Sequence, residues 1–208
     1  MSGRRLAPLG VADIAQVDDV CAGCMYWESV AVQEFVCGST CDEEAQREWF
    51  RRVHEEWGEC GRAATANGEV FGFIKYAPVE YFPQTAHLPV RPPDPDAPLI
   101  ACLHIRDNAR RHGLGRLLLH AALRDMHGRG ERRVWAYALA NPADVRVSPM
   151  VGMDFLLRNG FTVERPHPAY PLMRLDLRSL AVITENLEAV LESLRAPLLR
   201  RMPSPTVE

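Results

Sequence analysis

Apolar and polar positions alternate along this chain with two different periods, and together they predict a mixture of helices and strands. The clearest helical pattern covers residues 114–126, where apolar side chains recur at i, i+3, i+4, i+7 and i+8. Further helices are expected at 43–57, after a capping-box pattern at Thr40–Glu43, at 152–158 and at 184–199. Strands are expected at 62–66 and 69–77, joined by an Asn67-Gly68 turn, and at 99–105, 133–139, 161–164 and 172–177.

Three stretches have weaker patterns. Residues 1–20 are too irregular to assign, and residues 21–32 are consistent with a first strand. Residues 78–98 carry seven of the sixteen prolines, which disfavours regular structure and predicts a long surface loop. The order of the remaining elements indicates a mixed α/β sheet.

Composition excludes several classes of protein. With 47% hydrophobic and 25% charged residues, the chain is neither disordered, collagen-like nor a coiled coil. A net charge of −3 argues against general nucleic-acid binding. No apolar segment is long enough to span a membrane, and no apolar stretch follows the N-terminal charges as in a secretory signal, so a cytoplasmic protein is expected.

The cysteines allow two interpretations. Cys21, Cys24, Cys37 and Cys41 have spacings within the range of structural zinc sites. Bulky residues follow the first pair and no glycine-rich knuckle surrounds the second, so reduced core thiols and no metal are favoured. Cys60 and Cys102 are expected in the core.

The most informative stretch is the strand, turn and helix over residues 99–119. Gly113 and Gly115 allow a sharp turn and close approach of the backbone to a ligand, and the amides and dipole at the following helix start favour an anion. Arg110, Arg111 and Arg116 add positive charge. The pattern is neither a P-loop nor a dinucleotide fingerprint, so an anion site of another kind is predicted.

The segment Arg110-Arg111-His112-Gly113-Leu114-Gly115 resembles the Gln/Arg-x-x-Gly-x-Gly/Ala signature of the GNAT superfamily of acyl-CoA-dependent N-acyltransferases. The element order over about residues 40–177 and the Asn159-Gly160-Phe161 sequence agree with it. Residues 21–28 and 57–61 are similar to those of actinobacterial members. The resemblance implies a mostly antiparallel central sheet flanked by helices. We expect a single domain of this kind at 1–177, and a helical extension at 178–208 that packs on it and lies outside the resemblance.

The resemblance also implies acetyl-CoA as cosubstrate. Its pyrophosphate would lie on the amides of residues 111–116, and its pantetheine arm beside Leu103, His104 and Ile105. The acyl carbonyl would sit near a main-chain amide of that strand.

Proton transfer is less clear from the sequence. No carboxylate lies in 99–105, so His104 is the best candidate base, with Glu28 and Asp154 as weaker ones; a packed or solvated strand histidine is the alternative. Alternation places His104 on one face with Cys102. Leu156 occupies the position where many family members carry a proton-donating tyrosine, which leaves Tyr137 or a water as the acid.

These features predict an N-acetyltransferase that moves an acetyl group from acetyl-CoA to a primary amine by direct attack in a ternary complex. The alternatives are a non-catalytic acyl-CoA-binding sensor or interaction module and a zinc-stapled binding domain. The expected acceptor is a small-molecule or peptide amine, with no nucleic-acid or membrane partner, and the expected assembly is a monomer or homodimer. Acceptor recognition is placed on the proline-rich loop, at Tyr81, Phe82, His87, Asp94 and Asp96.

Overall fold

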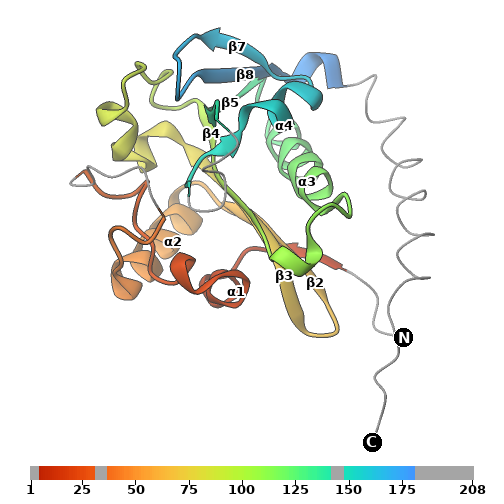
Figure 1. Cartoon of the computed structure of the whole chain (residues 1–208). Helices are drawn as coiled ribbons and strands as arrows, with labels where there is room; N and C mark the ends of the chain where they lie inside the picture. The colour runs from red at the N-terminus through yellow and green to blue at the C-terminus, as the bar shows by residue number, and fades with distance from the viewer. Residues whose placement is uncertain (1–4, 31–36, 142–147, 181–208) are drawn as a thin grey trace, which may run out of the picture.

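A twisted sheet of eight strands runs through the computed structural model, which describes residues 5–30, 37–141 and 148–180 (Figure 1). The strands are β1 (Arg5–Pro8), β2 (Gly61–Ala66), β3 (Glu69–Pro78), β4 (Pro98–Ile105), β5 (Arg133–Leu139), β6 (Val151–Gly152), β7 (Thr162–Arg165) and β8 (Leu172–Asp176). The α-helices are α1 (Val11–Val17), α2 (Glu43–Glu56), α3 (Leu114–Gly128) and α4 (Met153–Arg158). Short 3-10 turns are η1 (Asp19–Cys21), η2 (Val79–Tyr81), η3 (Pro83–His87), η4 (Asp107–Ala109) and η6 (Leu177–Leu180).

The strand order is β1-β2-β3-β4-β5-β8-β7, with β6 paired to β5 off this path. Neighbours are antiparallel except for the β4–β5 and β5–β6 pairs, which are parallel. The prediction of a mixed, mostly antiparallel sheet flanked by helices is therefore confirmed.

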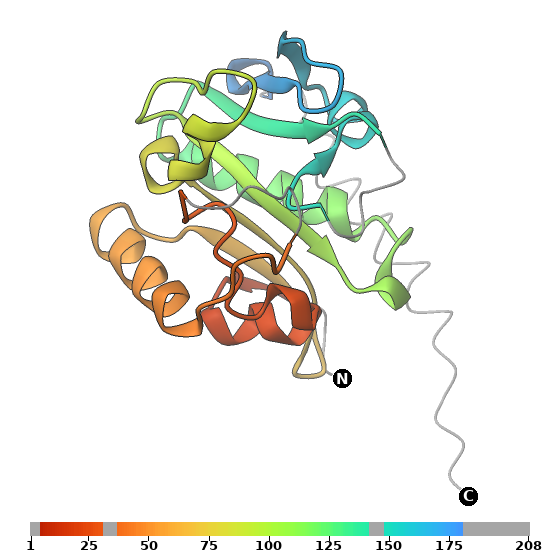
Figure 2. The same ribbon diagram turned by 60° about the vertical axis from the view of Figure 1, so that its left-hand side comes forward.

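Helices cover both faces of the sheet, so the protein has two hydrophobic layers (Figures 1 and 2). One layer joins α1 and α2 to the sheet through Ile14, Val17, Trp49, Phe50 and Val53. The other joins α3 and α4 to it through Leu118, Leu119, Leu123, Met126 and Leu156.

The position of α3 matters because its first turn follows the candidate anion site. Asp125 near the end of α3 accepts from Arg62 Nε of β2 at 2.5 Å and from the Tyr76 hydroxyl of β3 at 2.6 Å. Two strands thus hold the helix in register against the sheet.

Several predicted elements are confirmed within a residue or two: the hairpin, the strands at 99–105, 133–139, 161–164 and 172–177, and the helices at 114–126 and 152–158. Asn67 and Gly68 both have positive φ, 53° and 83°, as the hairpin turn requires. The helix predicted at 184–199 and most of the proposed extension at 178–208 lie outside the described residues. Within the described ranges, no helix combines the length and the apolar character needed to cross a membrane.

Near the N-terminus the structure has regular elements in a stretch that the sequence left unassigned, and it contradicts the strand predicted at 21–32. Residues 5–17 are ordered as an edge strand and a seven-residue helix, too short for a periodic signal. Among the described residues of 21–32 there is no strand, but a series of turns with one isolated bridge between Cys24 and Cys41.

The same bridge corrects the predicted capping box. Thr40 accepts from the Met25 amide and so lies outside α2, whose cap is Asp42, accepting from the Ala45 amide at 2.9 Å. Thr40 therefore belongs to the paired turns and not to the helix.

The proline-rich segment is also not a surface loop. It contains two 3-10 turns and buries Phe82, Leu88 and Val90, and Phe82 stacks on Trp49 with ring centroids 5.5 Å apart. The apolar residues between the prolines therefore pack in the hydrophobic core.

Candidate active site

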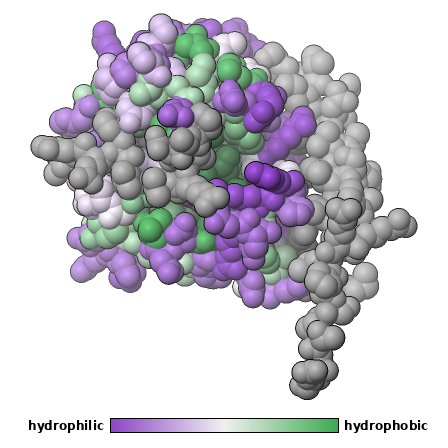
Figure 3. Space-filling view, in the orientation of Figure 1, coloured by the Kyte–Doolittle hydropathy of each residue, from purple (hydrophilic) through white to green (hydrophobic). Residues whose placement is uncertain are grey.

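The central strands β4 and β5 separate after a short stretch of pairing. In the described chain they pair only at Leu99–Trp135 and Ile100–Ala136, and then diverge (Figure 2). A register shift between β3 and β4 falls at the same level, beside Lys75 and Tyr76. Residues 101–105 of β4 therefore present a backbone edge that β5 leaves free. The space-filling view shows a hollow on this side of the molecule, with hydrophobic residues at its floor (Figure 3).

The predicted anion turn connects this free edge of β4 to α3. Arg111 and Gly113 both have left-handed backbones, with φ of 63° and 77°. Such a conformation in a non-glycine residue is costly and is typical of ligand sites. Gly113 caps α3 without a side-chain hydrogen bond, so the amides of Leu114, Gly115 and Arg116 in the first turn have no acceptor within the helix. These amides lie at the surface end of a helix dipole and can bind an anion.

The side chains of the turn divide into two groups. Arg110 is turned back onto the protein, with Nε 3.1 Å from the Ile105 carbonyl and 3.1 Å from Asp107 Oδ1, so it stabilises the turn. Arg111, His112 and Arg116 are exposed. The predicted residues therefore lie together in the turn, but the Arg110 side chain binds the protein itself and does not point to the predicted anion site.

Leu103 and Ile105 face the α3 layer, where Phe155 of α4 also packs. An added Cβ at Gly115 would lie 3.6 Å from the Phe155 ring and 3.9 Å from Leu103. Phe155 therefore lies beside the start of α3. The sequence did not predict this contact, because Phe155 and Gly115 are far apart in the chain.

His104 lies on the other face, stacked on Phe73 with ring centroids 5.3 Å apart, and Cys102 is buried in the same layer. The expected shared face is confirmed. Desolvation, with a smaller effect of Lys75 and Arg110, lowers the pKa of His104 to about 4, so its ring is neutral at pH 7. Its Nε2 lies 3.7 Å from Cys37 Sγ, and Nδ1 has no hydrogen-bond partner among the described residues.

The other candidate bases are placed differently. Glu28 forms an ion pair with Lys75 in which both side chains are almost fully buried. Burial alone would lower the pKa of Lys75, but the adjacent Glu28 carboxylate raises it above its usual value. Asp154 is exposed in the first turn of α4. Glu28 is therefore paired with Lys75, and His104 remains the candidate whose ring has one nitrogen without a partner among the described residues.

Neither Leu156 nor Tyr137 offers a free acidic proton in the described structure. Leu156 is fully buried in the α3 layer. The Tyr137 hydroxyl donates to the Val90 carbonyl at 2.9 Å, and burial raises its pKa well above the usual range. The Tyr137 proton is therefore held in a hydrogen bond within the core and is not offered to a leaving thiolate.

The cysteines are not arranged as a zinc tetrad. Within the ranges that the structure describes, no three His, Cys, Asp or Glu side chains are placed to hold a metal ion. Cys41 is exposed and donates to the Gly38 carbonyl at 3.4 Å, whereas Cys24 Sγ accepts from the Gly38 amide at 3.4 Å and Cys37 Sγ lies beside His104. Cys60 and Cys102 are buried, as expected.

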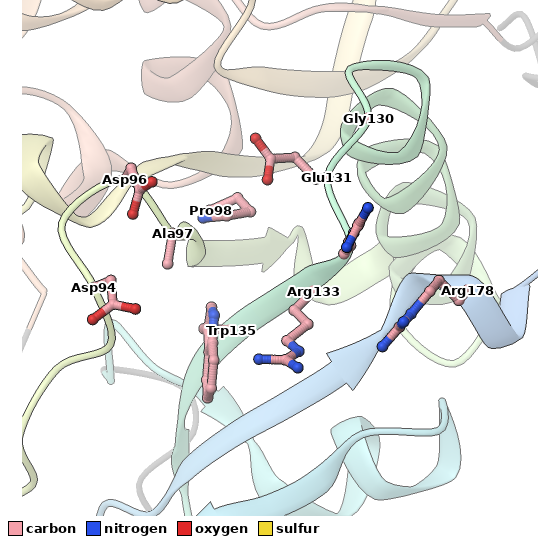
Figure 4. Close-up of a pocket in the computed structure, with 10 residues that line it drawn as sticks. Asp94, Asp96, Ala97, Pro98, Gly130, Glu131, Arg133, Trp135 and Arg178 are labelled. Carbon is pink, nitrogen blue, oxygen red and sulfur yellow. The ribbon is translucent and has the colours of Figure 1, made fainter.

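A pocket of about 480 Å³ lies at the opposite ends of β4 and β5 from the turn (Figure 4). Asp94, Asp96 and Glu131 line one part of it, and Arg133 and Arg178 another. The pocket is lined near the starts of β4 and β5 and not by the turn that leads into α3, so it is separate from the predicted coenzyme site.

The proposed acceptor loop needs a correction. Tyr81 and Phe82 belong to the core, with the Tyr81 carbonyl accepting from Trp49 Nε1 at 2.9 Å, and His87 is exposed. Asp94 and Asp96 line the remote pocket. Tyr81 and Phe82 therefore contact Trp49 in the core and are not exposed in a loop for acceptor binding.

Comparison with known proteins agrees with this geometry. The model of the acetyltransferase (GNAT) family matches residues 23–147, more than half of the chain. No curated protein matches this sequence significantly.

Solved structures with the same fold include YncA, a putative acetyltransferase from Salmonella typhimurium with acetyl-CoA, at TM-score 0.57, 17% identity and coverage of 84% of this chain and 94% of that one. Ribosomal-protein-alanine N-acetyltransferase from Brucella melitensis aligns at TM-score 0.56 and 16% identity, over 83% and 99%. PaiA N-acetyltransferase from Thermoplasma acidophilum, in complex with coenzyme A, aligns at 0.50 and 16%, over 84% and 99%. Such identities establish a shared fold.

β4 and β5 diverge, and α3 begins without a side-chain cap. Together these two features form a site that fits an acyl-coenzyme. The chain belongs to the acetyltransferase (GNAT) family. By family it is an acyl-CoA N-acyltransferase with acetyl-CoA as cosubstrate, and the free edge of β4 and the unpaired amides of α3 fit that group.

Proposed function

We propose that this protein transfers the acetyl group of acetyl-CoA to a primary amine, on a small molecule or peptide, by direct attack in a ternary complex. The observation that carries the proposal is the continuity of two features. The free edge of β4 leads, through a turn with two left-handed residues, into the uncapped start of α3.

The residues proposed to hold the cosubstrate are those of the turn and of β4. The amides of Leu114, Gly115 and Arg116 would bind the pyrophosphate, with the exposed side chains of Arg111 and Arg116 adding positive charge. The backbone of 103–105 would pair with the pantetheine arm. Bound in this way, acetyl-CoA supplies an activated acyl group, and the protein supplies its orientation.

His104 is proposed to accept a proton from the attacking amine. A primary amine is mostly protonated at neutral pH and cannot attack until it loses that proton. Among the described residues Nδ1 of the neutral His104 ring has no hydrogen-bond partner, and His104 stands on the strand beside the proposed acyl site. Its low pKa makes it a weak base, so it serves as a proton acceptor that must pass the proton on to solvent.

The cosubstrate site is tested by the thermal midpoint Tm with and without acetyl-CoA. At 100 times its dissociation constant, acetyl-CoA should stabilise the protein by about 2.7 kcal/mol, a rise in Tm of about 5 to 10 °C. Gly113→Ala should abolish this rise. The matched control is Gly130→Ala at the other end of α3, where φ is 85° and a Cβ would meet nothing.

Both substitutions put a methyl group on a left-handed residue and should cost about 1 to 2 kcal/mol of stability. Only Gly113→Ala should also lose the response to acetyl-CoA. If both variants keep the full response, or if the parent protein shows none at millimolar acetyl-CoA, the turn is not the cosubstrate site.

The transfer mechanism is tested by initial rates of CoA release with a panel of primary amines. A ternary complex predicts double-reciprocal lines that intersect when both substrates are varied. It also predicts that the protein gains no acetyl group when incubated with acetyl-CoA alone, as measured by intact mass. Parallel lines with an acetylated protein would show a covalent intermediate and refute direct attack, whereas acetyl-CoA binding without release for any amine would favour a non-catalytic acyl-CoA sensor.

A further inference from the structure

The pocket at the starts of β4 and β5 is lined by opposite charges that do not pair with each other. Asp94 and Asp96 belong to the loop before β4, whereas Glu131 and Arg132 precede β5 and Arg133 begins it. Within the described ranges, none of these five side chains takes part in a salt bridge. The pocket therefore holds separated charges of both signs that a ligand can join.

The acidic side of the pocket suits a cationic group. Glu131 is half-buried, and its burial, together with the negative charge of Asp96, raises the pKa of its carboxyl. A raised pKa means that the charged carboxylate is destabilised, and a cation bound beside it relieves that cost. Asp94 and Asp96 are exposed, so this side is open to a ligand.

The basic side has one arginine that suits a carboxylate. Arg178 is bound to Asp176 by hydrogen bonds of 3.2 and 3.1 Å, so its charge is already compensated. Asp176 lies opposite Arg133 across the β5–β8 pair but forms its salt bridge with Arg178. The exposed guanidinium of Arg133 can therefore bind a ligand carboxylate through two parallel hydrogen bonds.

Apolar groups lie between the two charged sides. Ala97, Pro98 and Trp135 line the pocket, and Figure 4 shows the Trp135 ring between the Asp94 side chain and the Arg133 guanidinium. Methylene groups of a ligand can pack on such a wall. The volume of about 480 Å³ is in the range of small-molecule sites. A ligand that fits therefore has charged ends and an aliphatic middle.

The charges of the pocket define the end groups of that ligand. Three carboxylates stand against the two guanidinium groups of Arg132 and Arg133, which leaves one negative charge in excess. A ligand that neutralises both sides carries two cationic groups and one carboxylate. We propose that this pocket binds a cationic α-amino acid such as L-arginine, with its carboxylate on Arg133 and its cationic groups on Asp94, Asp96 and Glu131. The site does not depend on the proposed acetyl transfer.

The first test titrates the ¹⁵N-labelled full chain with L-arginine. The indole N–H signal of Trp135, assigned with Trp135→Phe, should shift and saturate, because Trp135 lines the pocket. L-citrulline has a neutral side chain and agmatine has no carboxylate, so each should bind about 10- to 100-fold more weakly for want of one charge-assisted contact. No shift at millimolar L-arginine, or equal affinity for the three compounds, would overturn the proposal.

Matched variants assign the contacts. Arg133→Met should weaken L-arginine binding by about 10- to 100-fold without weakening agmatine, because only L-arginine has a carboxylate for Arg133. Glu131→Gln should weaken both compounds. Arg124→Met is the control, since it removes the same charge from an exposed position of α3 outside the pocket and should bind L-arginine as the parent does. Equal losses in Arg133→Met and Arg124→Met would show an effect of net charge and refute this site.

A last measurement distinguishes this pocket from the proposed acetyl-transfer site, because L-arginine also carries a primary amine. The imidazole ¹⁵N signals of His104, assigned with His104→Gln, should stay in place while the Trp135 signal shifts. Shifted His104 signals with an unchanged Trp135 signal would place the amino acid at the acceptor site. That result would refute the amino-acid pocket and leave the proposed acetyl transfer intact.

Discussion

His104→Gln is expected to lower kcat for acetyl transfer by about 10²- to 10⁴-fold, the usual contribution of a positioned base. Glutamine keeps a polar side chain beside Phe73 and Cys37 but cannot accept a proton from an amine. The KM for acetyl-CoA should change little, because the turn and the β4 backbone that are proposed to bind it are unaltered. Steady-state rates with a reactive amine acceptor measure both constants.

Two controls separate a chemical role of His104 from a structural one. His104→Gln should keep the acetyl-CoA-induced rise in Tm, which reports the intact cosubstrate site. The parent's His104 ring should also stay neutral from pH 8 down to about pH 5 in an NMR titration, since burial lowers its pKa to about 4. Unchanged kcat in the variant, or a His104 signal that titrates near pH 6.5, would contradict the proposed proton transfer.

The low pKa of His104 also shapes stability in acid. Its folded pKa of about 4 lies below the unfolded value of about 6.5, so on acidification the unfolded chain takes up the proton first. The contribution of the neutral ring is complete above pH 6.5 and is lost as the pH falls toward 4. The sequence alone suggested an ordinary histidine pKa near neutral pH. Burial of His104, which only the structure shows, lowers that pKa and makes the ring a weaker base.

Local patterns were enough to predict most of the fold. The β2–β3 hairpin follows from Asn67-Gly68, and α3 follows from its apolar spacing, because in both cases the signal lies within a few adjacent residues. Residues 5–20 were left unassigned and residues 21–30 were misassigned. The structure of 21–30 depends on contacts distant in sequence, such as Met25 with Thr40 and Gln46 with Cys21 and Cys24.

The candidate site divides in the same way. The glycines and arginines of the turn are consecutive, so the sequence showed them together. The contact of His104 with Cys37 joins residues 67 positions apart, and the pairing of Glu28 with Lys75 joins residues 47 apart. Neither pair has a local pattern, so only the folded chain reveals them.

The Glu28–Lys75 pair carries the largest expected effect on stability. Both side chains are almost fully buried, at 2% and 5% exposure, and the Lys75 ammonium lies 5.2 Å from the centre of the Trp49 ring. Glu28 Oε2 is buried without a hydrogen-bond partner among the described residues, so Lys75 is the main compensation for this carboxylate. Lys75→Met should therefore lower the free energy of unfolding by about 3 to 5 kcal/mol, measured by urea denaturation.

Removing both charges should reverse most of that loss. In Glu28→Leu/Lys75→Met no charge is left buried, and such replacements of buried ion pairs are often neutral or stabilising. Arg51→Met is the matched control. It breaks the ion pairs of Arg51 with Glu48 and Glu55, whose side chains are all more than half exposed, so its effect on stability should be much smaller than that of Lys75→Met. A Lys75→Met cost as small as that of Arg51→Met would mean that Glu28 is solvated. The pair would then not be what holds the turn with Glu28 against β3.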